Sequence, residues 1–100
     1  DMMWRIKNQL FAMPFEASES FRRKGEIEDS LYCNELLTLL FAENSRLWVR
    51  RAEDLARLQR EDEMIAVLNK AREAGFSDVA AIAKNPWFTP YLSSADFPFR

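Results

Sequence analysis

The stretch "LQREDEMIAVLNKAREAG", residues 58–75, carries the clearest helical signal in the sequence. Its apolar residues follow an i, i+1, i+4, i+7 spacing, which gathers side chains on one face of an α-helix. These residues are Met64, Ile65, Leu68 and Ala71. Gly75 stands where a left-handed C-terminal cap is expected, with Phe76 placed to pack back on the helix. The stretch therefore predicts a helix from Asp62 to Ala74.

Three consecutive acids, Glu61, Asp62 and Glu63, precede this helix and allow two interpretations. Hard-cation binding needs several oxygens converging within ~2.3 to 2.6 Å of one ion. Acids at a helix start are instead stabilised by the positive end of the helix dipole and by free amide hydrogens. No calcium-loop spacing and no glycine accompany the acids. We therefore interpret them as a helix start and predict no metal site.

Helical periodicity extends over most of the chain, which contains only two glycines and four prolines. Gly25 marks a second helix end, whereas Pro14 and Pro86 stand at plausible helix starts. Ser77 is the expected cap of a short helix near the C-terminus, and Asn44 or Ser45 the cap of a longer one. The expected helices span residues 2–12, 14–24, 26–42, 45–59, 62–74 and 77–84. The sequence therefore predicts an all-α fold.

The chain resembles itself at an offset of 34 residues, where "SFRRKGEIEDSLYCNELL" from residue 20 aligns with "DLARLQREDEMIAVLNKA" from residue 54. Phe21 then aligns with Leu55, and Arg23 aligns with Arg57. The acidic pairs also coincide, since Glu28 and Asp29 align with Asp62 and Glu63. Each segment is interpreted as a helix, a corner that carries acids, and a second helix.

With this period the chain resembles the tetratricopeptide repeat family, whose units pair two helices. In residues 45–78 the matching positions are Trp48, Ala52, Leu55, Leu68 and Ala71, while Arg51, Met64 and Phe76 depart from the pattern. In the earlier unit Phe21, Gly25 and Ser30 match, while Pro14 and Asn34 depart. Two helical hairpins without a true repeat are the alternative interpretation.

The resemblance implies one domain over residues 1–100, built as a right-handed array of two hairpins with capping helices. The units would be residues 13–44 and 45–78, and the caps residues 1–12 and 79–100. Caps are expected because each hairpin buries its apolar face only against neighbours. Trp4, Ile6 and Leu10 would cover the first hairpin. The domain would function alone or as part of a longer chain.

Composition excludes several classes of function. The 14 basic and 16 acidic residues nearly balance, which argues against a nucleic-acid or anionic-membrane partner. The chain has no histidine, so it lacks imidazole ligands and any Ser-His or Cys-His pair. Its one cysteine, Cys33, is expected to be a small buried thiol and indicates a reducing, cytoplasmic setting. We therefore expect no enzyme activity and no cofactor.

In tetratricopeptide arrays the first helices of the hairpins line a concave groove that holds peptides. Carried over to this chain, the resemblance implies that a peptide or protein partner contacts Glu19, Arg22, Arg23, Arg46, Val49, Glu53 and Arg57. Arginines there would bind peptide carboxylates in bidentate fashion.

The alternative is an ordinary solvated helix face. The i, i+4 spacing would pair Glu19 with Arg23 and Glu53 with Arg57, and such local pairs contribute little on their own. The same spacing would pair Arg50 with Asp54.

The C-terminal residues are rich in aromatic side chains and also allow two interpretations. Trp87, Phe88, Tyr91, Phe97 and Phe99 would cap the last helix, or an exposed set of them would form an interface. An incomplete cap would favour self-association. The second functional hypothesis is a helical accessory domain that packs against a larger enzyme through this segment.

Overall fold

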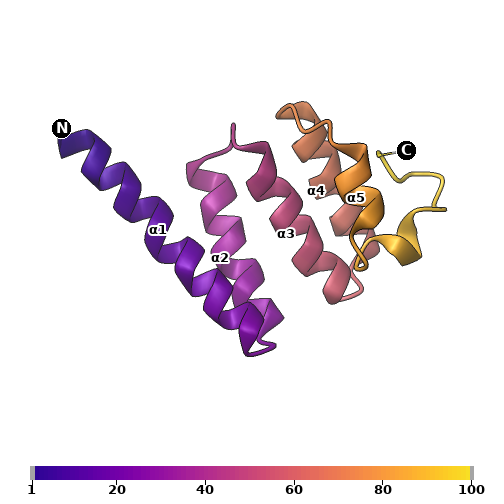
Figure 1. Cartoon of the computed structure of the whole chain (residues 1–100), viewed down its shortest axis with the longest axis horizontal. Coiled ribbons are helices and arrows are strands. Elements are labelled where there is room, and N and C mark those ends of the chain that lie inside the picture. Colours follow the sequence, from indigo (N-terminus) through magenta and orange to yellow (C-terminus); the bar gives the residue numbers. More distant parts are fainter. Residues whose placement is uncertain (1, 100) are drawn as a thin grey trace.

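The computed structural model describes the backbone of residues 2–99 and the side chains of residues 12–99. Five α-helices follow one another: α1 Met2–Arg23, α2 Ile27–Leu40, α3 Ser45–Arg57, α4 Glu61–Glu73 and α5 Val79–Lys84, before a 3-10 turn at Thr89–Tyr91. α1 to α4 pack in chain order, each against the next, and the C-terminal segment folds beside α4 and α5 (Figure 1). The all-α prediction is confirmed over the described residues.

The predicted helix break at Pro14 is wrong, because α1 runs from Met2 to Arg23 with Pro14 inside it. Proline removes one backbone hydrogen bond, and an internal proline costs about 3 kcal/mol. However, Ala12 and Met13 supply no side-chain acceptor that would favour a new helix start at the proline. The hydrogen bonds on either side are kept instead. The expected cover by Trp4, Ile6 and Leu10 lies outside the described side chains.

The corner between α1 and α2 and the corner between α3 and α4 lie 34 residues apart in the sequence. α1 ends at Arg23 and α3 at Arg57, while α2 begins at Ile27 and α4 at Glu61. The acids predicted at both helix starts lie in the first turns of α2 and α4, as expected.

The two corners are also closed by the same hydrogen bonds. The amide of Glu26 donates to the carbonyl of Phe21 at 2.8 Å, and the amide of Arg60 donates to Leu55 at 2.9 Å. These bonds belong to the Schellman motif, in which the residue after the helix adopts a left-handed conformation. Gly25 has φ 77° and the aligned Gln59 has φ 59°. Two different residue types therefore form the same corner.

The caps of the last helices differ from the prediction in detail. Gly75 closes α4 with φ 104°, and the amide of Phe76 donates to the carbonyl of Ala71, as expected. The N-cap of α5 is Asp78 instead of Ser77, because the Asp78 carboxylate accepts the amide hydrogen of Ala81 at 3.0 Å. Asn85 accepts from the amide of Trp87 and forms a turn, so Pro86 starts no α-helix.

The cluster of buried core side chains lies mainly between α3, α4 and the C-terminal segment. Its helical members include Ala52, Leu55, Met64, Leu68 and Ala71, and the C-terminal segment adds Phe88, Phe97 and Phe99. Phe88 is fully buried and lies against Phe97, with ring centroids 6.4 Å apart. The segment therefore closes the core at this end with its own aromatic side chains.

The aligned corners yield a paired stability prediction. Replacing Gln59 by glycine removes a left-handed strain of about 1–2 kcal/mol but adds unfolded-state entropy, so a gain of up to about 1 kcal/mol is expected. Gly25→Ala should lose about 1 kcal/mol, since a Cβ there meets no neighbour within 4 Å and only φ is unfavourable. Urea unfolding measures both changes. Gln59→Ala is the control and should gain nothing; an equal gain from alanine would contradict the conformational explanation.

Candidate functional site

The carboxylate of Asp54, on α3, is fully buried where α1, α2 and α3 meet. Its Oδ2 accepts hydrogen bonds from Ser30 Oγ at 2.7 Å and Asn34 Nδ2 at 2.6 Å, both on α2. Its Oδ1 accepts from Arg22 Nε on α1 at 3.0 Å. A buried charge is tolerated only when it is paired and hydrogen-bonded, and Asp54 meets both conditions. One side chain thus links three helices.

Arg22 connects the buried Asp54 carboxylate to Glu53, which lies nearer the molecular surface. Its Nη2 lies 2.9 Å from Asp54 Oδ1 and donates to the backbone carbonyl of Arg50 at 2.8 Å. Its Nη1 forms an ion pair with Glu53 Oε2 at 2.6 Å. The planar guanidinium therefore contacts three acceptors on α3, a geometry that a lysine ammonium cannot reproduce.

Two serine hydroxyl groups form a hydrogen-bonded chain that ends at Asp54. Ser18 Oγ on α1 lies 3.0 Å from Ser30 Oγ. Since the single hydroxyl proton of Ser30 is donated to Asp54, Ser18 must donate to Ser30. Arg50 Nη2 in turn donates to Ser18 Oγ at 3.2 Å. The donors thus run in one direction, from Arg50 towards the buried carboxylate.

Arg50, on α3, also contacts two side chains of α1. Its guanidinium forms an ion pair with Glu19 and lies 4.4 Å from the centroid of the Phe15 ring. The Arg50 hydrogen bond is the main reason that the pKa of the Glu19 carboxyl is lowered, with further lowering by the charges of Arg22 and Arg23; partial burial opposes it.

The network ends at the C-terminal segment. Glu53 Oε1 accepts from Asn85 Nδ2 at 2.9 Å, and Glu53 Oε2 lies 3.9 Å from Arg57 Nη2. The Arg57 guanidinium stacks 4.5 Å from the centroid of the Trp87 ring, which is a cation–π geometry. Side chains from α1, α3 and the C-terminal segment therefore form one strip of paired charges.

Of the seven residues predicted to contact a peptide, the structure brings Glu19, Arg22, Glu53 and Arg57 into this strip. Arg23 and Arg46 are exposed, and Val49 packs against the core cluster.

The expected local ion pairs are only partly present. Glu53 with Arg57 is confirmed, but Glu19 pairs with Arg50 and Asp54 with Arg22. Helical spacing pairs residues of one helix only, whereas the packing of α1 and α3 brings the part-buried Arg50 to Glu19 and the part-buried Arg22 to Asp54.

Sequence reasoning missed the centre of the network, although a signal existed. Ser30, Asn34 and Thr38 are buried on α2 at a spacing of four, which places a line of polar side chains on its buried side. Such a line indicates a buried polar partner. Because Asp54 is fully buried and its oxygens are already bonded to three side chains, its role here is structural.

The outer face of α2 is the second notable surface. Its exposed members are Glu28, Asp29, Tyr32, Glu35, Leu36, Leu39 and Leu40, four large apolar residues and three acids. Tyr32 is 73% exposed and Leu39 78% exposed. Two hollows of about 360 and 210 Å³ open on this side, and both are lined by Glu35 and Leu39. We call these seven residues the outer α2 face.

Cys33, at the edge of the outer α2 face, differs from its prediction. The thiol was expected to be buried, but it is partly exposed. Partial burial is the main reason that its pKa is raised, and the charges of Asp29 and Asp54 add to this effect. The thiol is therefore held in its protonated, poorly nucleophilic form.

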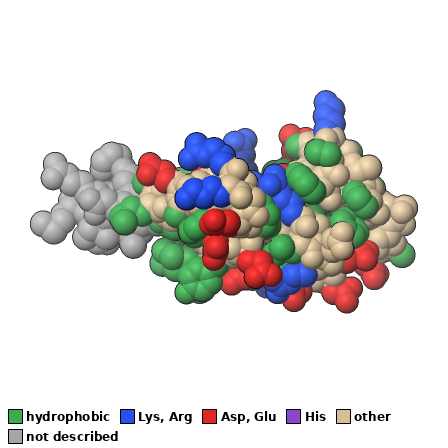
Figure 2. Space-filling model, turned by 90° about the horizontal axis from the view of Figure 1, so that it is seen from below, with side chains coloured by type: hydrophobic (Ala, Val, Ile, Leu, Met, Phe, Trp, Pro, Cys, Tyr) green, Lys and Arg blue, Asp and Glu red, His purple; other side chains and the backbone are tan. Residues whose placement is uncertain are grey.

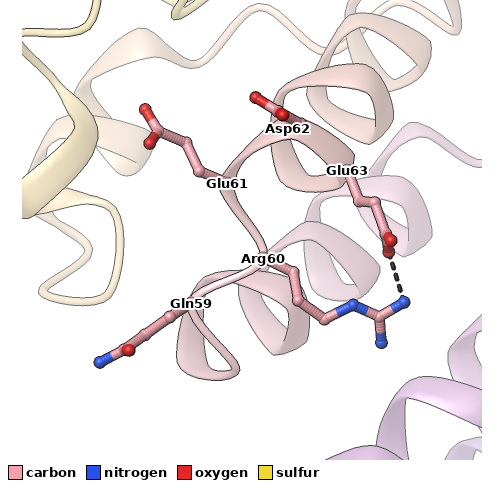
Figure 3. Close-up of a pocket in the computed structure, with 5 residues that line it drawn as sticks. All are labelled: Gln59, Arg60, Glu61, Asp62 and Glu63. Carbon is pink, nitrogen blue, oxygen red and sulfur yellow. Dashed lines mark ion pairs between the residues drawn. The ribbon is translucent and has the colours of Figure 1, made fainter.

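The acidic corner at residues 59–63 forms a hollow without converging ligands. Glu63 points to Arg60 and forms an ion pair with it, while Glu61 and Asp62 point away from that pair (Figure 3). Among the residues that the structure describes, no group of three or more histidine, cysteine or acidic side chains is arranged for a metal ion. The corner acids thus start α4, as the sequence indicated.

Two further properties bear on the choice of partner. On the face shown in Figure 2, basic and acidic side chains are interspersed and do not form one large area of a single sign. In the described part of the chain, no helix combines the length and apolar character that crossing a membrane requires.

The Asp54 network predicts a large loss of stability when its acceptor is changed. Asp54→Asn keeps the size of the side chain but removes the charge that offsets Arg22, so a loss of about 3–5 kcal/mol is expected. Urea unfolding followed by circular dichroism measures it. The control Glu63→Gln alters an exposed pair and should cost no more than about 1 kcal/mol. Similar small losses in both variants would contradict a central role for Asp54.

The lowered pKa of Glu19 predicts a pH dependence. Its contribution to stability is complete above the unfolded-state pKa of about 4.3 and is lost as the pH falls through the lower folded-state pKa. An NMR titration should show the Glu19 pKa rising towards its ordinary value in Arg50→Gln, whereas the control Arg46→Gln should leave it unchanged. An unaltered Glu19 titration in Arg50→Gln would show that Arg50 is not the cause.

No protein-family model, curated protein or solved structure matched the chain.

Proposed function

We propose that this chain is a protein interaction module. The observation that carries the proposal is the outer α2 face, where Tyr32, Leu36, Leu39 and Leu40 stand exposed along one helix beside two hollows. Contiguous exposed apolar surface is uncommon on monomers and is typical of sites that bind another protein. A partner that covers this face would bury the leucines and keep the acids at its edge.

The same proposal includes a tetratricopeptide-like arrangement of two hairpins, α1 with α2 and α3 with α4. The 34-residue offset between helix ends and the identical corner hydrogen bonds at Gly25 and Gln59 support it. Asp78, the N-cap of α5, stands at the same offset from Asn44, the N-cap of α3. α5 then corresponds to the shortened first helix of a third unit.

The groove predicted from the resemblance is the less favoured contact surface, because most of its charged residues already bind other side chains. Arg22 and Glu53 are paired, and Arg57 stacks on Trp87. A peptide would have to displace these contacts or use only Arg23 and Arg46, which are exposed. Separated surface charges contribute little binding energy on their own.

An accessory domain that packs through its C-terminal aromatics has less support. Phe88, Phe97 and Phe99 are buried within the chain, so only Trp87 and the half-buried Tyr91 remain for another domain or a second copy. The unpaired Cys33 fits a reducing setting such as the cytoplasm. We propose no enzymatic step.

The test uses peptides selected from a displayed library against the unmodified chain. Leu36→Glu/Leu39→Glu should raise the Kd of the selected peptides about tenfold or more, because it places charges where apolar contacts form. Arg23→Glu/Arg46→Glu, the matched control in the predicted groove, should change Kd less than about twofold. Fluorescence anisotropy measures binding.

Both double variants alter exposed positions, so their unfolding free energies should stay within about 0.5 kcal/mol per substitution of the unmodified chain. A loss of binding confined to the arginine variant would reject the outer α2 face and favour the predicted groove.

A further inference from the structure

The exposed charges of α2 all have one sign. Glu28, Asp29 and Glu35 lie on the outer α2 face, and Glu43 is exposed just beyond the helix end. The segment Ile27–Leu40 contains no lysine or arginine. The apolar side chains therefore lie among acids, although the chain as a whole has nearly balanced charge.

The spacing of the apolar residues fits a helical partner. Tyr32, Leu36, Leu39 and Leu40 follow i, i+4, i+7, i+8, a stripe that covers about two helical turns, or about 12 Å. Leu39 and Glu35 line both hollows and form the ridge between them. Two side chains one turn apart on a second helix would enter the two hollows, one on each side of this ridge.

An extended peptide is disfavoured on the same surface. Backbone recognition of an extended strand needs a sheet edge with free amide and carbonyl groups. A helix uses these groups internally, and α2 offers only side chains along its outer face. An amphipathic helix laid along α2 needs no free backbone groups on either side.

Charge decides against a second copy of the chain as the occupant. A two-fold symmetric contact through this face would bring the same patch of both copies together, and residues near the symmetry axis would meet their own counterparts. Glu35, in the middle of the stripe, would then approach its own counterpart, and the face offers no basic residue to compensate. Arg51, at the far wall of one hollow, stacks on Trp48 and donates to Thr38.

We propose that the outer α2 face binds a basic amphipathic α-helix of a partner protein, whose apolar stripe covers Tyr32, Leu36 and Leu39 and whose lysines or arginines meet Glu28 and Glu35. This inference rests on the proposed interaction function and names the class of its partner. Electrostatic complementarity of this kind chooses among partners and speeds their association.

Two synthetic helical peptides of about 18 residues, or five turns, provide the probes. They share one leucine stripe and differ only in their flanking positions, which are lysine in one and glutamate in the other. The lysine peptide should bind at least tenfold more tightly by fluorescence anisotropy, and added salt should reduce this preference.

Variants of the chain test whether the acids of α2 cause the preference for the lysine peptide. Glu28→Lys/Glu35→Lys should weaken the lysine peptide about tenfold and strengthen the glutamate peptide, whereas Asp96→Lys, an exposed acid in the C-terminal segment, should change either by less than about twofold. Leu39→Glu should weaken the lysine peptide about tenfold as well.

Three results would overturn the inference. Equal binding of both peptides, lost in Leu39→Glu, would reject the basic partner but leave the interaction surface standing. Sedimentation that shows a dimer dissolved by Leu39→Glu, with neither peptide bound, would assign the face to a second copy. Absence of both binding and dimerisation would reject a helical partner, and the library selection would then decide separately whether the surface binds protein.

Discussion

The carboxylate of Asp54 is the constraint on which the arrangement of the first three helices depends. It is fully buried, and the side chains that neutralise and bind it come from α1 and α2. Removing any donor leaves a buried charge short of partners, which costs more than the same interaction would contribute at the surface. Apolar contacts alone would tolerate small rotations of α2. The fixed positions of Ser30 and Asn34 do not, so the network determines which side of α2 faces inward.

That orientation explains why α2 carries leucines on its outside. Ser30, Asn34 and Thr38 lie on the buried side with Leu31 and Leu37, while Leu36, Leu39 and Leu40 lie on the other. In a helix whose apolar residues surround the whole circumference, hydrophobicity gives no preferred inner face. The polar contacts supply the preference, and the leucines that remain outside form the surface available for a partner.

Local features were predictable from the sequence, and long-range polar contacts were not. The acidic helix starts at Glu28 and Glu61 and the glycine corner at Gly25 depend on neighbouring residues, so spacing alone revealed them. Pro14 was predicted to start a helix, but it lies inside α1, and the residues before it offer no side-chain cap. The pairing of Arg22 with Asp54 joins residues far apart in the chain, and only the packing of α1 against α3 decides it.

The distribution of charge and apolar surface favours the outer α2 face over the predicted groove as the proposed contact surface. Arg22, a predicted peptide contact, connects α1 to α3, and so does Arg50. Three leucines of α2, Leu36, Leu39 and Leu40, are exposed. Because Ser30 and Asn34 belong to the same helix as the outer α2 face, a partner on that face would also hold α2 against Asp54. Binding and folding are then coupled through α2: whatever orders this helix from outside strengthens the contacts that orient it from inside.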